Sequence, residues 1–381
     1  MIDKVIEQYN FDGKLLNIET NDVGNINSTY VATFEQEDGS KKRYLIQKIN
    51  TTVFTEPYKL MKNIEGVTTY LKKELIKNND IDHKVLELVK TKDGKPLCFV
   101  DDGGDRDYYR IYDFIEDAVT YSCSTDKDIV YSTGKAFGNF QKQLRNYPMN
   151  KLEETIKDFH NTKKRFNQLL KDIKIDSSGR VLEVAEEIVF LLMREDIYSE
   201  IVEGLEDGSI PYRVTHNDTK VNNVMMNKET GKFMAVIDLD TVMPGSLLFD
   251  YGDGIRSTAS SALEDETDLS KVYLDLDLFR AYTDGYLSEM AEYITIDELF
   301  LMAESIRIIT LELAIRFLND YINGDTYFKV NYEKHNLDRV RNQIALAKDI
   351  ESKLDYMNTF IMETYNKYKN KEKPKKLIKE A

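Results

Sequence analysis

The chain has 381 residues, more than a single hydrophobic core usually supports, so two domains or lobes are expected. Hydrophobic residues make up 41% of it and charged residues 31%, a balance typical of folded rather than disordered proteins. The net charge of −15 argues against nucleic acid or an anionic membrane as the main partner, because binding to such surfaces depends on Lys and Arg. Two cysteines cannot form a disulfide framework, and neither a signal peptide nor an apolar run of about 20 residues is apparent. We therefore expect a cytoplasmic globular protein.

The first third of the chain is expected to fold as a small β-rich lobe that holds one helix. Strand-like segments alternate with polar, glycine-containing turns, which is the pattern of successive hairpins. Residues 57–75 instead carry apolar side chains at helical spacing. The expected hairpins pair residues 30–35 with 42–49 and residues 85–89 with 97–100, and a further turn at 101–104 leads to a strand at 108–114. The helix is expected to bury one face made of Leu60, Ile64, Val67 and Leu71.

The remainder of the chain is mainly helical in pattern. Residues 127–206 and 253–368 have helical character, and a short mixed segment lies between them at 212–240. The last residues are rich in lysine, which is typical of a solvated end. We therefore expect an N-terminal lobe over residues 1–115, a C-terminal lobe over 116–366 and a basic flexible tail over 367–381.

The mixed segment contains the pattern H-x-D-x-x-x-x-N, formed by His216, Asp218 and Asn223. Phosphoryl transfer to a hydroxyl needs a carboxylate that orients the nucleophile and takes its proton, and a nearby oxygen ligand for magnesium. An Asp and an Asn five residues apart on one tight loop can supply both. His216 suits a different task, because a histidine in such a loop can brace the turn through a backbone carbonyl.

An apolar strand that ends in an acidic residue follows this pattern. Residues 235–237 lead to Asp238, twenty residues beyond Asp218, and the turn at 227–232 suits a hairpin. This hairpin would bring Asp238 beside Asn223, where the two side chains can share a divalent cation. Magnesium favours a few hard oxygen ligands and keeps water or phosphate in its remaining positions. The sequence therefore predicts a kinase that uses ATP and Mg²⁺.

Together these segments resemble the catalytic core of the aminoglycoside phosphotransferase and choline kinase superfamily, relatives of protein kinases. The continuation from Ile237 to Asp253 is more similar to one branch, the N-acetylhexosamine 1-kinases. The resemblance extends over roughly residues 20–345 and includes segments 25–30, 47–54, 310–321 and 324–328. It implies an α+β, protein-kinase-like fold with a small β-rich lobe, a large helical lobe and the nucleotide between them. It also implies a small-molecule sugar as substrate. The sequence leaves open the oligomeric state, the choice between GlcNAc and GalNAc, and the preference for ATP over GTP.

The resemblance implies a role for each matching residue. Asp218 would be the catalytic base that contacts the substrate hydroxyl, and Lys220 would neutralise charge near the γ-phosphate. Asp238 would be the main magnesium ligand and Asn223 the second. The substrate-binding residues would be Asp218, Arg316 and Tyr327; the nucleotide-binding residues Gly24, Asn25, Ser28, Thr29 and Lys48; and the structural braces His216 and Asp250.

The expected nucleotide-binding residues depart from the pattern of the wider superfamily. The loop before Tyr30 has a single glycine, Gly24, so phosphate would be held by backbone amides and nearby polar side chains. Lys48 matches the lysine that grips the α- and β-phosphates, and both Glu65 and Glu74 are candidates for its partner. No A-P-E signal follows the acidic strand end, which argues against a protein kinase with a regulated activation loop.

Several alternatives remain open at this level. Asp240 either contacts a metal ligand without touching the metal itself, contacts the sugar, or is a solvated turn residue. Asp250 and Asp253 could cap a helix that begins near Gly252; the cap is favoured for Asp253 and the brace for Asp250. The alternative functions are a related kinase for choline, an aminoglycoside, homoserine or methylthioribose, and a nucleotide-binding scaffold without activity.

Overall fold

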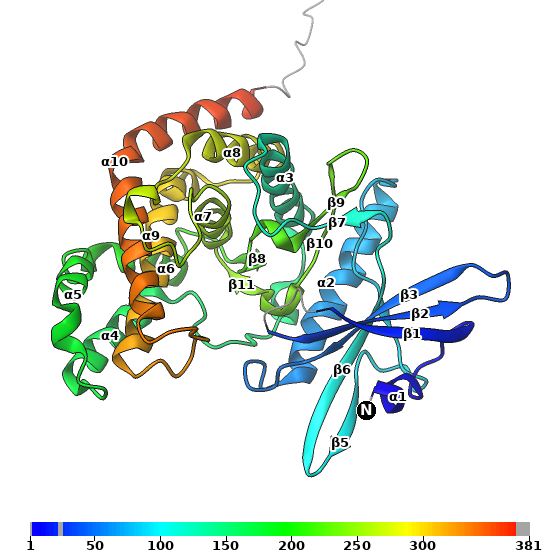
Figure 1. The fold of residues 1–381 in the computed structure, drawn as a ribbon. Coiled ribbons are helices and arrows are strands. Elements are labelled where there is room, and N and C mark those ends of the chain that lie inside the picture. Colours follow the sequence, from blue (N-terminus) through cyan, green and yellow to red (C-terminus); the bar gives the residue numbers. More distant parts are fainter. Residues whose placement is uncertain (1, 22–25, 371–381) are drawn as a thin grey trace, which may run out of the picture.

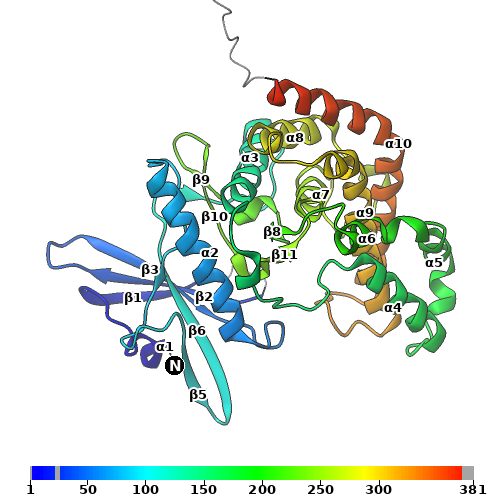
Figure 2. The same ribbon diagram turned by 180° about the vertical axis from the view of Figure 1, so that it is seen from behind.

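The computed structural model describes residues 2–21 and 26–370, which form a small lobe built on an antiparallel sheet and a larger helical lobe (Figure 1). The view from behind shows the same division, with helix α2 (Pro57–Lys77) lying between the sheet and the helical lobe (Figure 2). This arrangement confirms the expected α+β, protein-kinase-like fold. Among the described residues, no helix is both long and apolar enough to cross a membrane.

The small lobe is a six-stranded sheet in the order β1-β2-β3-β6-β4, with β5 also paired to β6. The hairpin predicted over residues 30–49 is confirmed as β2 and β3, joined with Glu35 opposite Lys41. The first strand, β1, was not anticipated, because most of its side chains are exposed and it lacks an apolar alternation. The elements of this lobe besides α2 are α1 (Ile2–Ile6), β1 (Lys14–Asn21), β2 (Ser28–Glu35), β3 (Lys41–Lys48), β4 (Leu88–Val89), β5 (Cys98–Asp102) and β6 (Asp105–Asp113).

The second predicted hairpin is wrong. Strands β4 and β5 do not face each other but follow one another along the same edge of β6. Gly103 and Gly104 have φ angles of +64° and +116°, and this left-handed backbone turns the chain tightly from β5 into β6. The hairpin partner of β5 is therefore β6, which follows it in sequence.

The sheet has two chemically different faces, which decides where its polar side chains point. On one face, Tyr44 and Ile46 of β3 pack into a cluster with α1. On the other face, Leu45 packs with the helix α2, whose predicted apolar face is buried as expected. Because side chains alternate along a strand, the next residues Gln47 and Lys48 also point to opposite faces, Gln47 with Leu45 and Lys48 with Ile46.

The large lobe consists of helices around two small sheets. Strand β7 (Ala118–Val119) pairs with β9 (Val224–Asn227), which forms the predicted hairpin with β10 (Phe233–Val236); β8 (Arg213–Thr215) pairs with β11 (Met243–Gly245). The helices are α3 (Lys127–Leu144), α4 (Thr162–Ile175), α5 (Ala185–Leu192), α6 (Glu200–Asp207), α7 (Leu247–Thr258), α8 (Leu276–Met290), α9 (Ile296–Ile322) and α10 (His335–Lys369).

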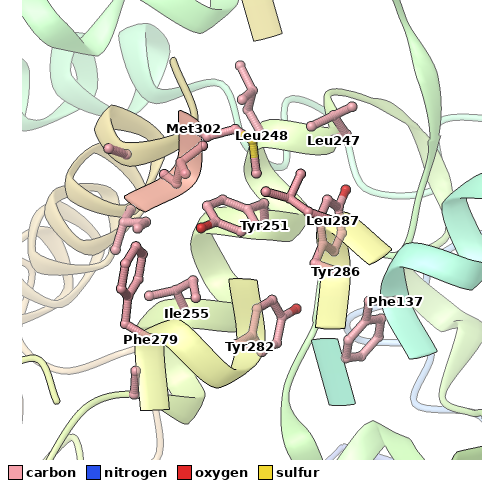
Figure 3. Close-up of a cluster of buried hydrophobic side chains, with 14 of the residues drawn as sticks. Phe137, Leu247, Leu248, Tyr251, Ile255, Phe279, Tyr282, Tyr286, Leu287 and Met302 are labelled. Atoms are coloured by element: carbon pink, nitrogen blue, oxygen red, sulfur yellow. The ribbon is translucent and has the colours of Figure 1, made fainter. Parts of the chain in front are cut away.

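Helix α7 lies in the centre of the large lobe. Its side chains Tyr251 and Ile255 point into a cluster of aromatic and aliphatic residues from α8 and its neighbours (Figure 3). Gly252 lets α7 approach α9 closely, since a Cβ at this position would lie 2.6 Å from the carbonyl oxygen of Ser305. The most deeply buried helix of the lobe therefore has a fixed position from which to support the residues above it.

The expectation that this helix begins near Gly252 is wrong. The helix begins at Leu247, where the hydroxyl of Ser246 accepts the N–H of Leu248 at 3.2 Å as the N-cap. Asp250 and Asp253 lie inside the helix, so neither is its cap. Their carboxylates are available for contacts with the loop that carries Asp218.

Candidate active site

The loop between β8 and β9 brings Asp218, Lys220 and Asn223 together. The side-chain amide of Asn223 donates to the backbone oxygen of Asp218 at 2.9 Å and to its carboxylate Oδ2 at 3.0 Å. Lys220 Nζ lies 2.9 Å from the other carboxylate oxygen, Oδ1, and the charge of Asp218 raises the pKa of Lys220. Both oxygens of Asp218 are therefore oriented by neighbours on its own loop.

The β9–β10 hairpin places Asp238 next to Asn223. The N–H of Ile237 donates to the carbonyl oxygen of Asn223 at 2.9 Å, so the two residues leave the hairpin side by side. Asp238 follows with a left-handed φ of +57°, which turns the chain sharply after the strand. The surrounding protein and the negative charges of Asp240 and Asp218 raise the pKa of Asp238 to about 7, although its side chain remains exposed to solvent.

This arrangement fits a magnesium ion. The Asn223 amide nitrogen is occupied by Asp218, which leaves its amide oxygen as a possible ligand, and an exposed carboxylate with excess negative charge lies beside it. Among residues 2–21 and 26–370, no three His, Cys, Asp or Glu side chains converge as a metal site. Magnesium commonly takes only one or two protein ligands and completes its shell with water and substrate phosphate. Asn223 and Asp238 would be those ligands.

Two buried side chains hold the loop from below. The carboxylate of Asp250 accepts the backbone N–H of His216 at 2.9 Å and of Asn217 at 2.7 Å. The ring of His216 lies 2.9 Å from the carbonyl oxygen of Ile237 through Nε2. Gln141 of α3 donates to Asp250 at 2.5 Å and was missed by the sequence reasoning, because a lone glutamine in a helix gives no local signal. The positions of His216 and Asp250 are those that a bracing role requires.

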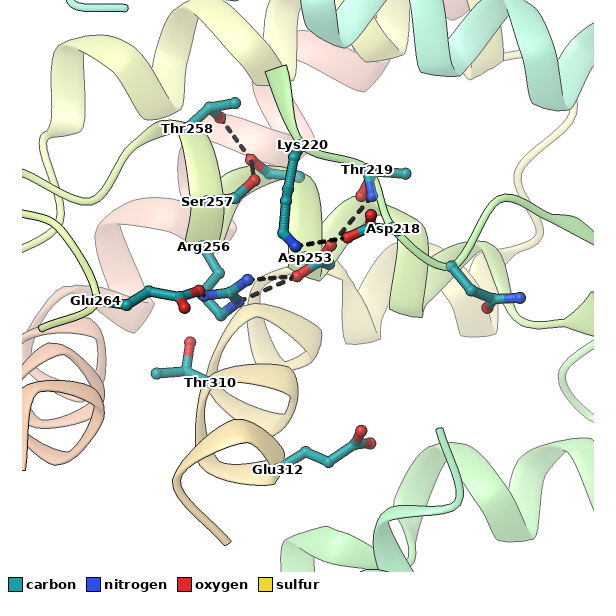
Figure 4. A network of polar contacts seen from close by, with 12 residues as sticks. Asp218, Thr219, Lys220, Asp253, Arg256, Ser257, Thr258, Glu264, Thr310 and Glu312 are labelled. Atoms are coloured by element: carbon teal, nitrogen blue, oxygen red, sulfur yellow. Dashed lines mark hydrogen bonds and ion pairs between the residues drawn. The ribbon is translucent and has the colours of Figure 1, made fainter. Parts of the chain in front are cut away.

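A second carboxylate of α7 reaches the same loop. Asp253 accepts the N–H of Thr219 at 3.1 Å and forms a two-point contact with Arg256, which also pairs with Glu264 (Figure 4). Burial opposes the charged form of Asp253, but the charges of Arg256 and Lys220 outweigh it and lower its pKa. Arg256 was missed by the sequence reasoning, although its spacing of three residues from Asp253 in a helix was available as a signal.

The solvated-turn alternative for Asp240 is excluded by its burial. Arg110 of β6 forms a two-point ion pair with it: Nη1 donates to Oδ1 at 2.5 Å and Nη2 donates to Oδ2 at 2.9 Å. Asn27 also donates to Oδ2, at 2.7 Å. Arg110 was missed by the sequence reasoning, because an arginine in a strand is usually solvent-facing, whereas this residue is only 1% exposed.

The candidate nucleotide-binding residues are not brought together as a group. Thr29 lies on the same sheet face as Gln47, to which its hydroxyl is hydrogen-bonded at 3.3 Å, whereas Ser28 lies opposite Lys48 on the other face. Lys48 Nζ contacts Asp107 at 2.7 Å. The two glutamates considered for Lys48 have other partners, namely Lys90 for Glu65 and Lys77 for Glu74. Gly24 and Asn25 lie outside the described residues.

The two residues expected to bind the sugar lie near one another beyond the catalytic loop. Arg316 of α9 has its guanidinium 5.6 Å from the ring centres of both Phe159 and Phe328. Tyr327 precedes Phe328, is 67% exposed, and packs edge-on against its ring at 4.8 Å. The buried carboxylate of Asp320 holds this short loop by accepting the N–H of Tyr327 at 2.7 Å and of Phe328 at 2.8 Å.

A polar cluster that the sequence reasoning missed connects Arg316 to the catalytic loop. His160 lies 3.0 Å from Glu312 through Nδ1 and 3.3 Å from the carbonyl oxygen of Asn217 through Nε2. Burial opposes the charged form of His160, but the carboxylate of Glu312 outweighs it and raises the pKa of the imidazole. Arg165 Nε and Glu312 Oε2 are buried without a hydrogen-bond partner. Both atoms are therefore free to form a hydrogen bond with a polar ligand.

The fold is shared with solved small-molecule kinases. A microcompartment-associated aminopropanol kinase is similar with a TM-score of 0.60 and 14% identity, over 94% of this chain and 98% of that chain. An aminoglycoside phosphotransferase from Alicyclobacillus acidocaldarius gives a TM-score of 0.58 at 12% identity, over 95% and 96%. The amicoumacin kinase hAmiN, solved with AMP-PNP and Ca²⁺, gives 0.53 at 13% identity, over 96% and 92%. Residues 21–291 match the phosphotransferase enzyme family APH, and the chain therefore belongs to this family.

Proposed function

We propose that the protein is an ATP- and Mg²⁺-dependent kinase that phosphorylates the anomeric hydroxyl of an N-acetylhexosamine. Membership of the phosphotransferase family supports the reaction type, and the grouping of Asp218, Asn223 and Asp238 supports the position of the chemistry. The intact set of these side chains argues against a scaffold without activity. The sugar as acceptor is supported by the resemblance of residues 237–253 and by the charges around Arg316.

In the proposed reaction, Asp218 accepts the proton of the acceptor hydroxyl. The hydroxyl oxygen forms the new bond to the γ-phosphorus as the bond to the β–γ bridging oxygen breaks, and ADP leaves. Lys220 holds Asp218 at 2.9 Å and adds positive charge where the phosphoryl group develops negative charge. Asn223 and Asp238 would hold Mg²⁺, which offsets the phosphate charge when bound.

The charges next to the catalytic loop favour an uncharged acceptor and are the observation that carries the choice of substrate. Burial lowers the pKa of Arg165, and the positive charge of the nearby Arg316 lowers it further. Glu312 and Asp158 are carboxylates near Arg165, and His160 pairs with Glu312. A cationic acceptor such as an amino alcohol or an aminoglycoside would meet two arginines, whereas sugar hydroxyls can accept from a guanidinium and donate to a carboxylate.

The test is an assay of ADP release with Mg²⁺ across GlcNAc, GalNAc, other free sugars, 1-amino-2-propanol, choline, homoserine, methylthioribose and an aminoglycoside. We expect turnover with an N-acetylhexosamine and a sugar 1-phosphate as product, identified by its ³¹P signal. Turnover restricted to choline, an amino alcohol or an aminoglycoside would overturn the acceptor while keeping the reaction type.

The matched variant is Asp218→Asn. General-base assistance typically contributes about 10²–10⁴ in rate, so we expect a loss of this order in kcat with little change in ADP affinity. Wild-type turnover in this variant would remove Asp218 from its role. Arg316→Lys is the companion for the acceptor side, since a lysine cannot keep the planar fork. It should raise the KM for the sugar and leave the KM for ATP nearly unchanged.

A further inference from the structure

A buried ion pair joins the two lobes two residues beyond the proposed metal ligand. Arg110 lies on β6 of the small lobe, and Asp240 lies in the turn that follows Asp238 in the large lobe. Their side chains are 2% and 4% exposed. A buried pair of this kind is costly to break, because a single charge would remain in the protein interior.

The carboxylate of Asp240 is fully used by protein donors of the small lobe. Oδ1 accepts from Arg110, and Oδ2 accepts from Arg110 and from Asn27. Asn27 in turn accepts the backbone N–H of Asn50 at 2.9 Å, so the segments before β2 and after β3 share the same network. A metal ion would have to displace these donors, which argues against Asp240 as a direct ligand.

The sheet explains why an arginine of β6 reaches this position. Gln47 of β3 lies directly opposite Arg110 in the strand register, and Thr29 lies opposite Gln47. Directly opposite residues point to the same face of a sheet, so these three side chains form one polar row. Gln47 accepts from Arg110 Nε at 3.0 Å, which fixes the guanidinium from its other side. Lys48 points to the opposite face and cannot take this place.

Asp238 lies within electrostatic reach of this row. Its carboxylate is acted on by the negative charges of Asp218 and Asp240 and by the positive charges of Arg110 and Lys220. Arg110 is the cation that the small lobe contributes. A second contact from the small lobe reaches the same turn: the side-chain amide of Asn63 of α2 donates to the carbonyl oxygen of Val242 at 3.0 Å. The turn that begins at Asp238 is therefore held by side chains of the small lobe at Asp240 and again two residues further on, at Val242.

We propose that Arg110 is a positioning residue of the kinase reaction, which acts through Asp240 to hold Asp238 where magnesium and nucleotide bind together. Arg110 thus links the two lobes, and through it the small lobe, where the nucleotide is expected to bind, supports the metal ligand Asp238 of the large lobe. The inference rests on the part of the proposed function that concerns Mg²⁺ and nucleotide, and it is independent of the acceptor.

The experiment measures the affinity for ADP by calorimetry on the full chain, once with Mg²⁺ and once with EDTA. The dissociation constant for ADP in EDTA, divided by that in Mg²⁺, reports how strongly the metal increases the affinity for the nucleotide. A loss of stability alone does not change this ratio. In Arg110→Lys, the lysine keeps the charge but cannot bridge both oxygens of Asp240. Changes to residues that support metal ligands typically cost about 10–100-fold in metal affinity, so we expect this ratio to fall by at least roughly tenfold.

Two further variants separate positioning from folding. The double variant Arg110→Met/Asp240→Leu removes both charges, and such replacements are often neutral or stabilising. We expect it to melt near the wild-type temperature while its ratio stays low. Arg194→Lys is the matched control, because Arg194 makes a similar two-point contact with Glu351, at 2.6 and 2.7 Å, in the large lobe. Its ratio should equal that of the wild type.

The outcomes discriminate clearly. A wild-type ratio in Arg110→Lys, or a ratio that returns in the double variant, would overturn the positioning role. An increased affinity for Mg²⁺ in Arg110→Lys would also overturn it, since Asp240 would then be a ligand that Arg110 masks. A fall of the ratio in Arg110→Lys, together with a wild-type protein that phosphorylates no N-acetylhexosamine, would support the positioning role of Arg110 and reject the sugar as acceptor. The two proposals therefore fail separately.

Discussion

The buried carboxylate of Asp250 accepts the backbone N–H of Asn217 at 2.7 Å, directly before Asp218 in the chain. Asn217 has a left-handed φ of +64°, a conformation that a non-glycine residue holds only with support from its surroundings. The helix α7 therefore fixes the backbone from which the proposed base projects. The two residues are 33 positions apart in the sequence, and their hydrogen bond connects the central helix of the large lobe to the proposed catalytic loop.

The first prediction concerns this support. In Asp250→Asn, an amide group replaces one carboxylate oxygen and faces a backbone donor, so we expect a loss of about 1–3 kcal/mol in the free energy of unfolding. A shift of the loop by about 1 Å can cost roughly 100-fold in kcat. Thermal melting and steady-state kinetics measure the two effects. Asp275→Asn is the control, since Asp275 also accepts two backbone N–H groups, at 2.8 and 3.1 Å, but caps α8. Equal kinetics for both variants would contradict the bracing role.

The second prediction concerns Lys220. In Lys220→Met, Asp218 loses the cation at 2.9 Å from its Oδ1, and the developing charge on the phosphoryl group loses its neighbour. Removal of one such group typically costs about 10²–10³ in kcat, and we expect a loss of this size with little change in ADP affinity. Lys228→Met removes an exposed lysine from the β9–β10 turn and should leave the kinetics unchanged. A weaker ADP affinity with unchanged kcat in Lys220→Met would assign this lysine to nucleotide binding instead.

The third prediction is a pH dependence that follows from Asp238. Its pKa is raised from 3.8 to about 7, so the folded metal-free protein holds this proton more tightly than the unfolded chain. The resulting stabilisation is present below about pH 4 and is lost as the pH rises towards 7. Because Mg²⁺ requires the deprotonated carboxylate, its affinity should rise between pH 6 and pH 8.

The expected change in Mg²⁺ affinity is about two- to tenfold, the lower values reflecting the screening of an exposed side chain by solvent. Calorimetric titration with Mg²⁺ in the presence of ADP at the two pH values measures it. Asp238→Asn removes the titrating carboxyl, so only the smaller pH dependence that comes from protonation of the ADP phosphate should remain. The same pH dependence in wild type and Asp238→Asn would assign the proton to another group.

The fourth prediction concerns the loop that carries Tyr327. Asp320→Ala removes the acceptor for the N–H groups of Tyr327 and Phe328 and leaves Asn336 without a partner on this carboxylate. The ring of Phe328 should then no longer stay beside Arg316. We expect the KM for the acceptor to rise by about tenfold, which corresponds to a loss of roughly 1.4 kcal/mol in acceptor binding. The affinity for ADP should not change; a parallel loss of ADP affinity would show general unfolding of the lobe instead.

The sequence by itself determined the local parts of this protein. The H-x-D-x-x-x-x-N pattern and the strand that ends at Asp238 lie within about two dozen residues, and a hairpin brings such neighbours together wherever it forms. The helix over residues 57–77 was predictable for the same reason, since its apolar face repeats with the helical period. The family resemblance added the two-lobed fold, which the structure confirms.

Only the tertiary structure decided the partners of the buried charges. Arg110 and Asp240 are 130 residues apart, and His160 and Glu312 are 152 apart. No periodicity in the sequence predicts such pairs, because they depend on how two lobes or two helices pack and not on the spacing along one element. The predicted pairing of residues 85–89 with 97–100 was wrong for a related reason. Two strands with similar patterns can both pair with one edge of a third strand, as β4 and β5 do with β6. The sequence therefore determined which residues carry the proposed chemistry, because they are close together along the chain. The packing of the lobes and helices determined which charged residues pair to hold the site.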